Sequence, residues 1–446
     1  MKIEKEEMIS VLDEGVVVRD VLKDIAMSGT QDDDAFFVMS VGDVIKQYET
    51  WTKMLPTVKP YYAVKCNDSL VVLQIMNALG ANFDCASKGE ISKVLELGVS
   101  PDRIIYANPA KMKSHLTYAA EKNVNLLTFD SVNELYKIKM IHPNARIILR
   151  ISADSYDSQC PAMSMKFGVN PDTEAYSLLK EAISLGLNVV GISFHVGSGC
   201  RETDAYGRAL ASVKNLFNQA RDGLGLKMTI VDIGGGFQNC NFDKTCATLN
   251  RAFSDYFQDD PDVKFIAEPG RFMVASAYTL ATQIHSMRIN NNQTMFYIND
   301  GVYGSFNCLL YDHASVTPIP LKENTFGSPL ITCSVWGPTC DSLDLISEDC
   351  LLPSCLNIGD WILFESMGAY TIPTSTKFNG FLPPKVHHIC DYENWCRIKE
   401  SLPNIIDNYT YQQTPHWKHQ QNTTNSNGYE NSPSTGYLLH PIPTPH

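Results

Sequence analysis

The chain has 446 residues, of which 44% are hydrophobic and 19% are charged. A chain of this length is expected to fold as one large domain or two ordinary ones, and its composition excludes a disordered or fibrous protein. Its 36 Lys and Arg residues against 49 Asp and Glu residues give a formal net charge of −13. Because nucleic acid binds basic surfaces and this chain is acidic, we expect no nucleic acid as a partner.

The sequence also argues against secretion, membrane insertion and bound metal. Residues 1–15 lack the apolar core of a signal peptide, and no uncharged apolar stretch approaches the ~20 residues that span a membrane. The 13 cysteines include no C-x-x-C pair, which is typical of reduced thiols rather than of a disulfide framework or a zinc site. We therefore expect a cytoplasmic protein with no membrane contact and no metal.

In chain order, the first predicted element is a strand over residues 36–40, ahead of a long repeating region. There, eight short apolar runs alternate with amphipathic segments of helical period, such as residues 91–98 and 131–142. The runs cover residues 60–65, 82–87, 103–106, 125–130, 145–152, 189–196, 228–236 and 264–270. Eight strands alternating with helices predict a (β/α)8 barrel with parallel strands, and an open doubly wound sheet is the alternative.

After residue 275 the pattern changes to strands separated by Gly, Pro and Asn turns, at residues 293–300, 328–337 and 359–371. The fold class is therefore α/β, a barrel followed by a C-terminal β-sandwich or β-barrel domain that includes the N-terminal strand. The predicted division is an N-terminal segment 1–40 contributing to the β domain, the barrel 41–275, the β domain 276–405 and a tail 406–446. The tail has too few apolar residues to offset its ordering entropy, which predicts disorder.

Charged residues stand where several of the predicted barrel strands end. Functional groups collect at the carboxyl ends of barrel strands, and here the apolar runs carry Lys65, Asp84 and Arg150. A single such lysine is often a solvated cation, whereas a desolvated amine with a lowered pKa suits Schiff-base chemistry. Because isolated buried charges are costly, opposite charges at several strand ends indicate a paired polar site.

The later strand ends add groups that suit a phosphate and an aromatic ring. The glycine triplet 234–236 offers N–H groups that a phosphate can approach closely. Glu268 and Arg271 form either a local surface ion pair or two separate functional groups, and His195 precedes Ser198 by three residues. An amine, phosphate donors, a carboxylate for a ring nitrogen and a flat imidazole are together the requirements of pyridoxal 5′-phosphate (PLP).

Longer motifs resemble those of the eukaryotic ornithine decarboxylases. They are YYAVKCND, FDCASKGEI, IIYANPAK, FHVGSGC, DIGGGF, AEPGRFMVASA, NDGVYGSFNCLLYDHA, WGPTCDSLD and GDWILFESMGAYT. The resemblance runs from about residue 10 to about residue 380. It implies a PLP-dependent amino-acid decarboxylase with an alanine-racemase-like barrel and a C-terminal β domain, acting as a homodimer whose active sites are shared between the subunits.

Position by position, the resemblance implies how the cofactor would be held. Lys65 would form the internal aldimine, His195 would stack on the ring and Glu268 would contact the ring nitrogen. The phosphate would be held by Ser198, Gly235, Gly236, Arg271 and Tyr370, with Asp84, Glu90 and Arg150 as a supporting polar shell.

The resemblance also implies the substrate and dimer contacts. Tyr311, Asp312 and Asp341 match substrate-binding positions, and the two acids would read a distal amine. Cys340 matches a residue that helps to protonate the product carbanion. Lys166 and Asp344 match positions that pair across the dimer.

The sequence leaves alternatives open for the substrate and for the presence of catalytic activity. Two carboxylates for a distal ammonium favour ornithine, with putrescine as the product in polyamine biosynthesis. Departures from the family pattern at Ser315, Thr317 and Ser342 leave open a paralogous decarboxylase acting on lysine or leucine. The family also includes antizyme inhibitors, which lack catalysis and cofactor binding, so an inactive regulator is a further alternative. The complete polar set favours an enzyme.

Antizyme is a further partner that the resemblance implies, because residues 115–140 roughly match the family's antizyme-binding region. The tail, however, does not resemble the family's C-terminal degradation signal. We therefore predict weak or absent antizyme-stimulated degradation, and a short half-life that lengthens on deletion of the tail would contradict this.

Overall fold

A computed structural model describes residues 9–28, 33–153, 155–159, 165–290, 293–322 and 327–401. Within this part, eight parallel strands form a closed barrel in which β10 pairs with β3 and so joins the last strand to the first. The strands are β3 (Val58–Ala63), β4 (Asn82–Cys85), β5 (Ile104–Tyr106), β6 (Leu126–Phe129), β7 (Arg146–Arg150), β8 (Asn188–Ser193), β9 (Ile230–Asp232) and β10 (Lys264–Ala267). Closure confirms the predicted barrel and rules out the open sheet.

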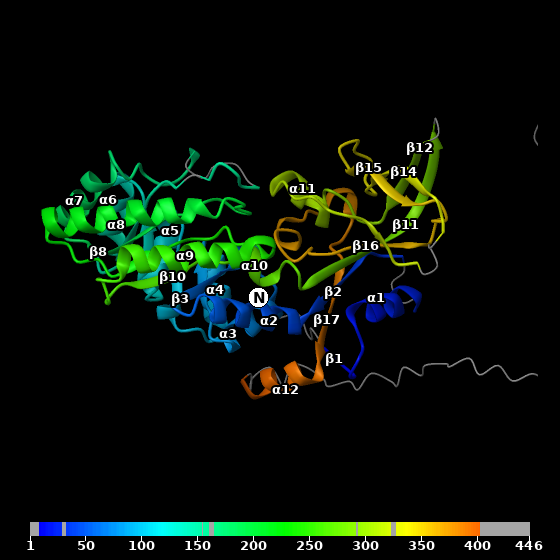
Figure 1. Cartoon of the computed structure of the whole chain (residues 1–446), viewed down its shortest axis with the longest axis horizontal. Helices are drawn as coiled ribbons and strands as arrows, with labels where there is room; N and C mark the ends of the chain where they lie inside the picture. Colours follow the sequence, from blue (N-terminus) through cyan, green and yellow to red (C-terminus); the bar gives the residue numbers. More distant parts are fainter. Residues whose placement is uncertain are drawn as a thin grey trace, which may run out of the picture. The chain divides into compact units, whose positions relative to one another are not determined.

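Helices before, between and after these strands cover the barrel, and α8 and α9 run beside each other on its outside (Figure 1). They are α2 (Val41–Met54), α3 (Leu70–Ala78), α4 (Lys88–Glu96), α5 (Lys113–Glu121), α6 (Val132–Ile141), α7 (Ala175–Ser184), α8 (Asp204–Leu224), α9 (Phe242–Phe257) and α10 (Arg271–Val274). Serine caps start three of them: the Ser40, Ser87 and Ser131 hydroxyls accept hydrogen bonds from the N–H groups of Asp43, Glu90 and Glu134.

The barrel interior is filled by apolar side chains that alternate with outward-facing ones. Side chains from six strands form one packed cluster, consisting of Tyr61, Ile105, Leu126, Ile148, Ile230 and Ile266. Their sequence neighbours, such as Tyr62, Tyr106 and Val231, belong to the larger cluster that packs with the helices. Because successive side chains on a strand point to opposite faces, the smaller cluster is the inner layer of the barrel.

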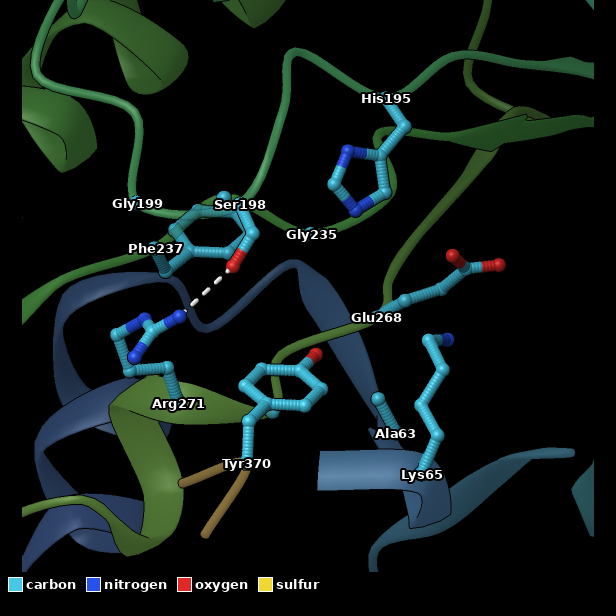
Figure 2. Close-up of a pocket in the computed structure, with 12 residues that line it drawn as sticks. Ala63, Lys65, His195, Ser198, Gly199, Gly235, Phe237, Glu268, Arg271 and Tyr370 are labelled. Atoms are coloured by element: carbon cyan, nitrogen blue, oxygen red, sulfur yellow. Dashed lines mark hydrogen bonds between the residues drawn. The ribbon is translucent and has the colours of Figure 1, made fainter. Parts of the chain in front are cut away.

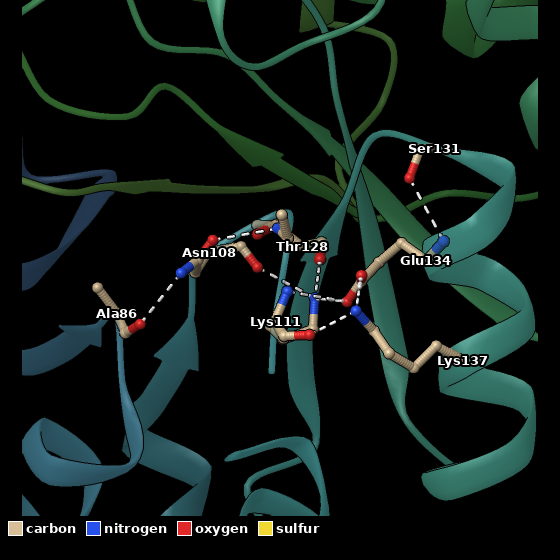
Figure 3. A network of polar contacts seen from close by, with 8 residues as sticks. Ala86, Asn108, Lys111, Thr128, Ser131, Glu134 and Lys137 are labelled. Carbon is tan, nitrogen blue, oxygen red and sulfur yellow. Dashed lines mark hydrogen bonds and ion pairs between the residues drawn. The ribbon is translucent and has the colours of Figure 1, made fainter. Parts of the chain in front are cut away.

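A buried ion pair braces the barrel between β5 and β6 (Figure 3). The Lys111 ammonium lies 2.9 Å from the Glu134 carboxylate and donates to the carbonyls of Thr128 and Asn108 at 2.5 and 3.1 Å. Burial lowers the pKa of Lys111 to about 8, although Glu134 opposes that shift. Lys137 pairs with the same carboxylate at 2.5 Å, so the buried Glu134 is fully compensated.

The second part of the described chain is a nine-stranded sheet in the order β1-β17-β2-β11-β12-β14-β15, with β16 and β13 attached beside β11. Its strands are β1 (Ile9–Leu12), β2 (Phe36–Ser40), β11 (Tyr278–Asn290), β12 (Gln293–Ile298), β13 (Ile319–Pro320), β14 (Leu330–Trp336), β15 (Leu345–Pro353), β16 (Trp361–Phe364) and β17 (Lys385–Asp391). Short helices accompany it: α1 (Val18–Met27), α11 (Cys308–Tyr311) and α12 (Tyr392–Ser401). β2 pairs with β11 and β17, which confirms that the N-terminal strand belongs to this sheet.

The predicted strand over residues 359–371 is wrong in its second half. The strand β16 ends at Phe364, and the chain then folds back onto the barrel. Asn67 donates to the carbonyl of Gly368 at 2.9 Å, and the Tyr370 N–H donates to the carbonyl of Cys66 at 2.9 Å. These bonds place a loop of the sheet against the end of β3. The predicted tail, 406–446, lies outside the described residues.

Two features are absent from the described residues. No helix in these ranges is long and apolar enough to cross a membrane. The same ranges hold no group of three or more His, Cys, Asp or Glu residues arranged to bind a metal ion.

Candidate active site

Polar residues continue the inner face of the barrel at its carboxyl end. Arg150, Asp232 and Glu268 each stand two positions after an inner apolar residue, and all three are buried. The period of two puts them on the inner face. Asp84 shares that face, because β4 is in register with β3 there, and its side chain is fully buried. The paired polar site expected from the strand ends is therefore present.

Lys65 directly follows β3 and forms an ion pair with Asp84 on β4. Burial alone would lower the pKa of Lys65, but the nearby carboxylates of Asp84 and Glu268 outweigh it and raise that pKa above its usual range. The expectation of an amine with a lowered pKa is thus wrong for the protein without a cofactor. The reason is that the neighbouring strand ends supply the negative charge that keeps the ammonium ionised.

Glu268 forms an acid pair with Asp232. Burial, together with the charge of Asp232, raises the pKa of Glu268 well above its ordinary value. Burial likewise raises the pKa of Asp232 to about 6, against a hydrogen bond that its carboxylate accepts from the Gly234 N–H at 3.0 Å. Two buried carboxyl groups in contact do not both ionise readily, so the pair shares a proton.

His195 follows β8 and is held as a neutral imidazole. Burial, with the positive charges of Arg150 and Lys65, lowers the pKa of His195 well below its usual value. Its Nδ1 accepts a hydrogen bond from the Gly197 N–H at 2.9 Å. The remaining proton is therefore assigned to Nε2, which leaves an uncharged flat ring.

Of these groups, Lys65, His195 and Glu268 line one cavity (Figure 2). Its lining consists of Ala63, Lys65, His195, Ser198, Gly199, Gly235, Gly236, Phe237, Glu268, Gly270, Arg271 and Tyr370. Figure 2 shows Lys65 and Glu268 on one side, Ser198 and Arg271 on the other, and His195 above them.

The side of the cavity opposite Lys65 suits a phosphate group. Arg271 donates to the Ser198 hydroxyl at 3.0 Å, and its guanidinium lies 5.3 Å from the Tyr370 ring centroid. Gly236 has φ +106°, and a Cβ there would lie 2.8 Å from the carbonyl oxygen of Gly197. A Cβ on Gly235 would lie 2.8 Å from the His195 imidazole. Only glycine therefore fits this bend.

Unpartnered buried atoms support the fit to PLP. Among the described residues, Asp84 Oδ1 and Arg271 Nε are buried without a hydrogen-bond partner. Such atoms are costly unless a bound group or water satisfies them. On one side of the cavity, a negatively charged phosphate would meet the Arg271 guanidinium. On the other side, a basic ring nitrogen would meet the carboxyl groups of Glu268 and Asp232.

Arg271 pairs with Asp312 rather than with Glu268. Its NH2 group donates to both carboxylate oxygens of Asp312, at 2.6 and 2.7 Å. The local surface ion pair that the Glu268–Arg271 spacing allowed is thus wrong: Glu268 follows a strand on the inner face, whereas Arg271 begins α10 and turns toward the sheet.

The remaining predicted substrate residues lie away from the cavity wall of their own chain. Tyr311, Cys340 and Asp341 are not among the residues that line the cavity, and Tyr311 and Cys340 are exposed. The Asp341 carboxylate accepts a hydrogen bond from the Tyr303 hydroxyl, and that bond lowers the pKa of Asp341. Within one chain, Asp341 is thus engaged by Tyr303, while Asp312 is engaged by Arg271.

The expected pairing of Lys166 with Asp344 of a second subunit stays a prediction. Within its own chain the Asp344 side chain is 1% exposed, and its carboxylate accepts hydrogen bonds from the Val302 and Thr339 N–H groups at 2.7 and 2.9 Å. Lys166 is exposed, with its ammonium 5.0 Å from the Phe167 ring centroid.

Sequence reasoning missed three residues around the site. Asp232 carried a usable signal, because an acid ends the apolar run MTIVD just before the glycine triplet. Tyr303 and Gln159 carried none, because their partners Asp341 and Asp312 lie 38 and 153 residues away in the sequence. Glu90, expected in the polar shell, accepts from the Ala86 N–H at 2.6 Å beside Asp84.

Comparisons with known proteins agree with this geometry. Residues 41–275 match the pyridoxal binding domain of the pyridoxal-dependent decarboxylases. The chain is 46% identical to antizyme inhibitor 2 of Xenopus laevis over 415 residues, covering 89% of this chain and 90% of that protein. It is 43% identical to ornithine decarboxylase of Rattus norvegicus over 411 residues, covering 87% and 88%.

Solved structures extend the comparison. The arginine decarboxylase of Paramecium bursaria Chlorella virus, solved bound to agmatine, superposes with a TM-score of 0.80 at 39% identity. The match covers 83% of this chain and 100% of that one. The chain therefore belongs to the pyridoxal-dependent decarboxylases, carbon–carbon lyases whose cofactor is PLP.

Proposed function

We propose that this chain decarboxylates a dibasic L-amino acid, with L-ornithine as the first choice, to give CO2 and putrescine. One observation carries the proposal: the cavity joins a Lys65–Asp84 pair on one side to an anion-binding side around Arg271 on the other. A protein that only binds a partner has no need of this arrangement.

PLP, when bound, supplies an aldehyde that combines with amines and a ring that accepts the electron pair released when CO2 leaves. The residues of the chain meet these needs separately. Lys65 must lose a proton before its nitrogen acts as a nucleophile, and Asp84 already accepts its hydrogen bond. His195 offers an uncharged ring for stacking, and the proton shared by Glu268 and Asp232 lies ready for a ring nitrogen.

A distal ammonium on the substrate would complete the site. Asp312 is 5% exposed, and a buried carboxylate favours cationic partners. Ornithine carries such a charge and leucine does not. We assign proton return after CO2 loss to the Cys340 thiol, which lies on the loop between β14 and β15 beside Asp341.

The test is release of CO2 from ornithine, lysine, arginine and leucine by the PLP-loaded protein. We expect ornithine to have the highest kcat/KM, and leucine to be poor because it offers no distal ammonium to Asp312 and Asp341. If another acid is turned over while ornithine is not, the substrate assignment is wrong.

A catalytically inactive regulator is the second candidate, favoured by the 46% identity to antizyme inhibitor 2 of Xenopus laevis. The full set of Lys65, Asp84, His195, Glu268 and Arg271 argues for catalysis instead. Incubation with PLP separates the two. An enzyme turns yellow and releases CO2, and a colourless protein without turnover would favour the regulator.

We further propose a homodimer with shared active sites, in the cytoplasm. Cys340 and Asp341 do not line the cavity of their own chain, so a second copy is needed to bring them to it. The nearby side chains of Leu310, Tyr311 and Leu343 are 49%, 68% and 66% exposed, as expected of an apolar contact surface. The free thiols of the described cysteines are compatible with a reducing compartment.

A further inference from the structure

Gln159 links the wall of the cavity to Asp312. Its side-chain amide donates to the Asp312 backbone carbonyl at 2.6 Å and to the Asp312 carboxylate oxygen Oδ2 at 3.2 Å. Its backbone N–H donates to the carbonyl of Gly199 at 3.1 Å. Gly199 lines the cavity, whereas Asp312 follows α11 in the sheet. One residue thus connects the segment after β7 to both parts of the site.

The backbone at Gly199 is shaped to accept this contact. Gly199 has φ +68°, a conformation that favours glycine. A Cβ at Gly199 would lie 2.5 Å from the Cβ of Gln159. Gly199 therefore makes room for Gln159 at this place. The neighbouring pair, Ser158 and Cys200, forms an antiparallel β-bridge that fixes the register of the two segments.

Arg271 alone is a poor anchor for Asp312. Its single NH2 group donates to the Ser198 hydroxyl and to both oxygens of the Asp312 carboxylate. An NH2 group has only two hydrogens, so three acceptors already exceed its capacity. A phosphate at the side of the cavity where Arg271 meets Ser198 (Figure 2) would draw on the same guanidinium, whose Nε is buried without a hydrogen-bond partner. Gln159 then remains as an independent donor to Asp312.

Gln159 also restrains how the Asp312 carboxylate is turned. Oδ2 accepts from both Arg271 and Gln159, and Oδ1 accepts from Arg271. Because Gln159 comes from a different segment than Arg271, its bond to Oδ2 opposes rotation of the carboxylate away from a distal ammonium.

We propose that Gln159 is a positioning residue that sets the preference for dibasic substrates by holding Asp312. This inference rests on the proposed function, because it assigns Gln159 to the distal end of the same substrate. Gln159 acts only through Asp312 and takes no part in bond breaking.

The test compares Gln159→Leu and Gln159→Glu with a matched control, Gln283→Leu, in the PLP-loaded enzyme. Gln283 donates a single hydrogen bond to the carbonyl of Gly359 in the sheet, at 3.3 Å. Gln159→Leu is expected to raise KM for ornithine about tenfold or more, as for one lost hydrogen bond to a charged group, with kcat changed less than twofold. Gln159→Glu is expected to raise KM further, because a carboxylate repels Asp312.

Leucine as a competing ligand separates positioning from a general structural defect. Its inhibition constant should stay within twofold in Gln159→Leu, because leucine has no distal charge for Asp312 to read. PLP content should match the wild type, and Gln283→Leu should behave as wild type throughout. An unchanged KM for ornithine in Gln159→Leu, or equal weakening of ornithine and leucine, would overturn the proposal.

A failure of the proposed function has a different signature, since the wild type itself would then turn over none of the four amino acids. The Gln159–Asp312 link is testable even then, by thermal unfolding of Gln159→Leu, Asp312→Asn and the double variant. We expect the shift of the double variant to be smaller than the sum of the two single shifts, because both single changes disturb the bond between the Gln159 amide and the Asp312 carboxylate. Additive shifts would show that the two residues are not coupled.

Discussion

The Lys65 ammonium donates a hydrogen bond to the Asp84 carboxylate across the carboxyl ends of the neighbouring strands β3 and β4. Lys65 is therefore held as an ammonium, beside the Asp84 carboxylate that can accept its proton. This arrangement keeps a lysine ionised in a buried site and still gives it a short route to the neutral amine. Formation of a covalent bond to PLP is the direct test.

Borohydride reduction of the PLP-loaded protein should fix one pyridoxyl group on Lys65, detected by peptide mass spectrometry. Lys65→Ala should carry no such label, stay colourless and lose activity on the order of 10³-fold or more. Lys93→Ala is the matched control, because Lys93 also forms an ion pair, with Asp68, outside the cavity lining. A label on another residue, or none on the wild type, would contradict the role given to Lys65.

The sequence was sufficient to predict the barrel and the charged strand ends, because both follow from local patterns. Alternation of apolar runs with helical segments requires no knowledge of distant contacts, and Asp84 and Arg150 are conspicuous inside apolar runs. The pairings could not be predicted in the same way. Arg271 has Asp312 and Glu268 as possible partners, and only the direction in which α10 leaves the barrel decides between them.

The burial of charged side chains in loops could not be predicted from the sequence either. Lys111 stands in an irregular segment, where a lysine is usually solvated, yet its side chain is fully enclosed with Glu134. The burial of Asp344 also depends on distant residues, because Val302 donates to it from 42 positions away. Both cases follow from packing between segments that are distant in the sequence, which leaves no local pattern.

The acid pair predicts how the stability of the cofactor-free protein depends on pH. The pKa of Asp232 is about 6 in the folded chain, against ~3.9 when unfolded. Between about pH 4 and pH 6 the folded state therefore binds more protons, so its stability falls as pH rises through this range. Asp232→Asn has no carboxyl group to titrate at this position, so this loss of stability is absent from the variant. The free energy of unfolding of Asp232→Asn, relative to that of the wild type, should therefore rise with pH by on the order of 2 kcal/mol.

Urea unfolding of the cofactor-free proteins between pH 4.5 and pH 7.5 would measure this difference. The wild type and Asp232→Asn should diverge up to about pH 6 and then run parallel. Asp259→Asn, at an exposed position, should show a difference from the wild type that does not change with pH. A flat difference for Asp232→Asn, or one that shrinks with rising pH, would contradict the assignment of a shared proton.

The proposed sharing of active sites predicts complementation between two inactive variants. Lys65→Ala leaves the loop with Cys340 intact, and Cys340→Ala leaves the cavity with Lys65 intact. If each site combines Lys65 of one subunit with Cys340 of the other, mixed dimers regain one complete site. Equal amounts, after exchange of subunits, should reach about a quarter of wild-type activity, because half of the dimers are mixed and each has one intact site of two.

The control for complementation is a mixture of Lys65→Ala with Asp84→Asn, two changes on the same side of the site. Lys65 and Asp84 form their pair within one chain, so each site of a mixed dimer carries one of the two changes and neither site is intact. Activity should stay at the level of the two single variants. No recovery with Cys340→Ala would indicate that Lys65 and Cys340 come from the same subunit.

Two cysteines in the sheet predict a specific response to oxidation. Cys333 on β14 and Cys350 on β15 are directly paired, with their sulfur atoms 3.4 Å apart. The hydrogen bond shared with Cys333 lowers the pKa of Cys350, which favours the thiolate that reacts with an oxidant. With hydrogen peroxide, the Cys350 thiolate should form a sulfenic acid and release hydroxide, and Cys333 should then displace water to close a disulfide.

Peptide mapping after peroxide treatment of the folded protein should show Cys333 and Cys350 linked, with a loss of about 2 Da. The link closes a 17-residue separation and should raise the free energy of unfolding by about 3 kcal/mol. Cys333→Ser should prevent it, whereas Cys355→Ser, on the turn after β15, should not. Because the connecting loop of these strands carries Cys340 and Asp341, the linked protein also tests whether a rigid hairpin still supports turnover. Failure to link under conditions that oxidise exposed Cys240 would contradict the close approach of the two thiols.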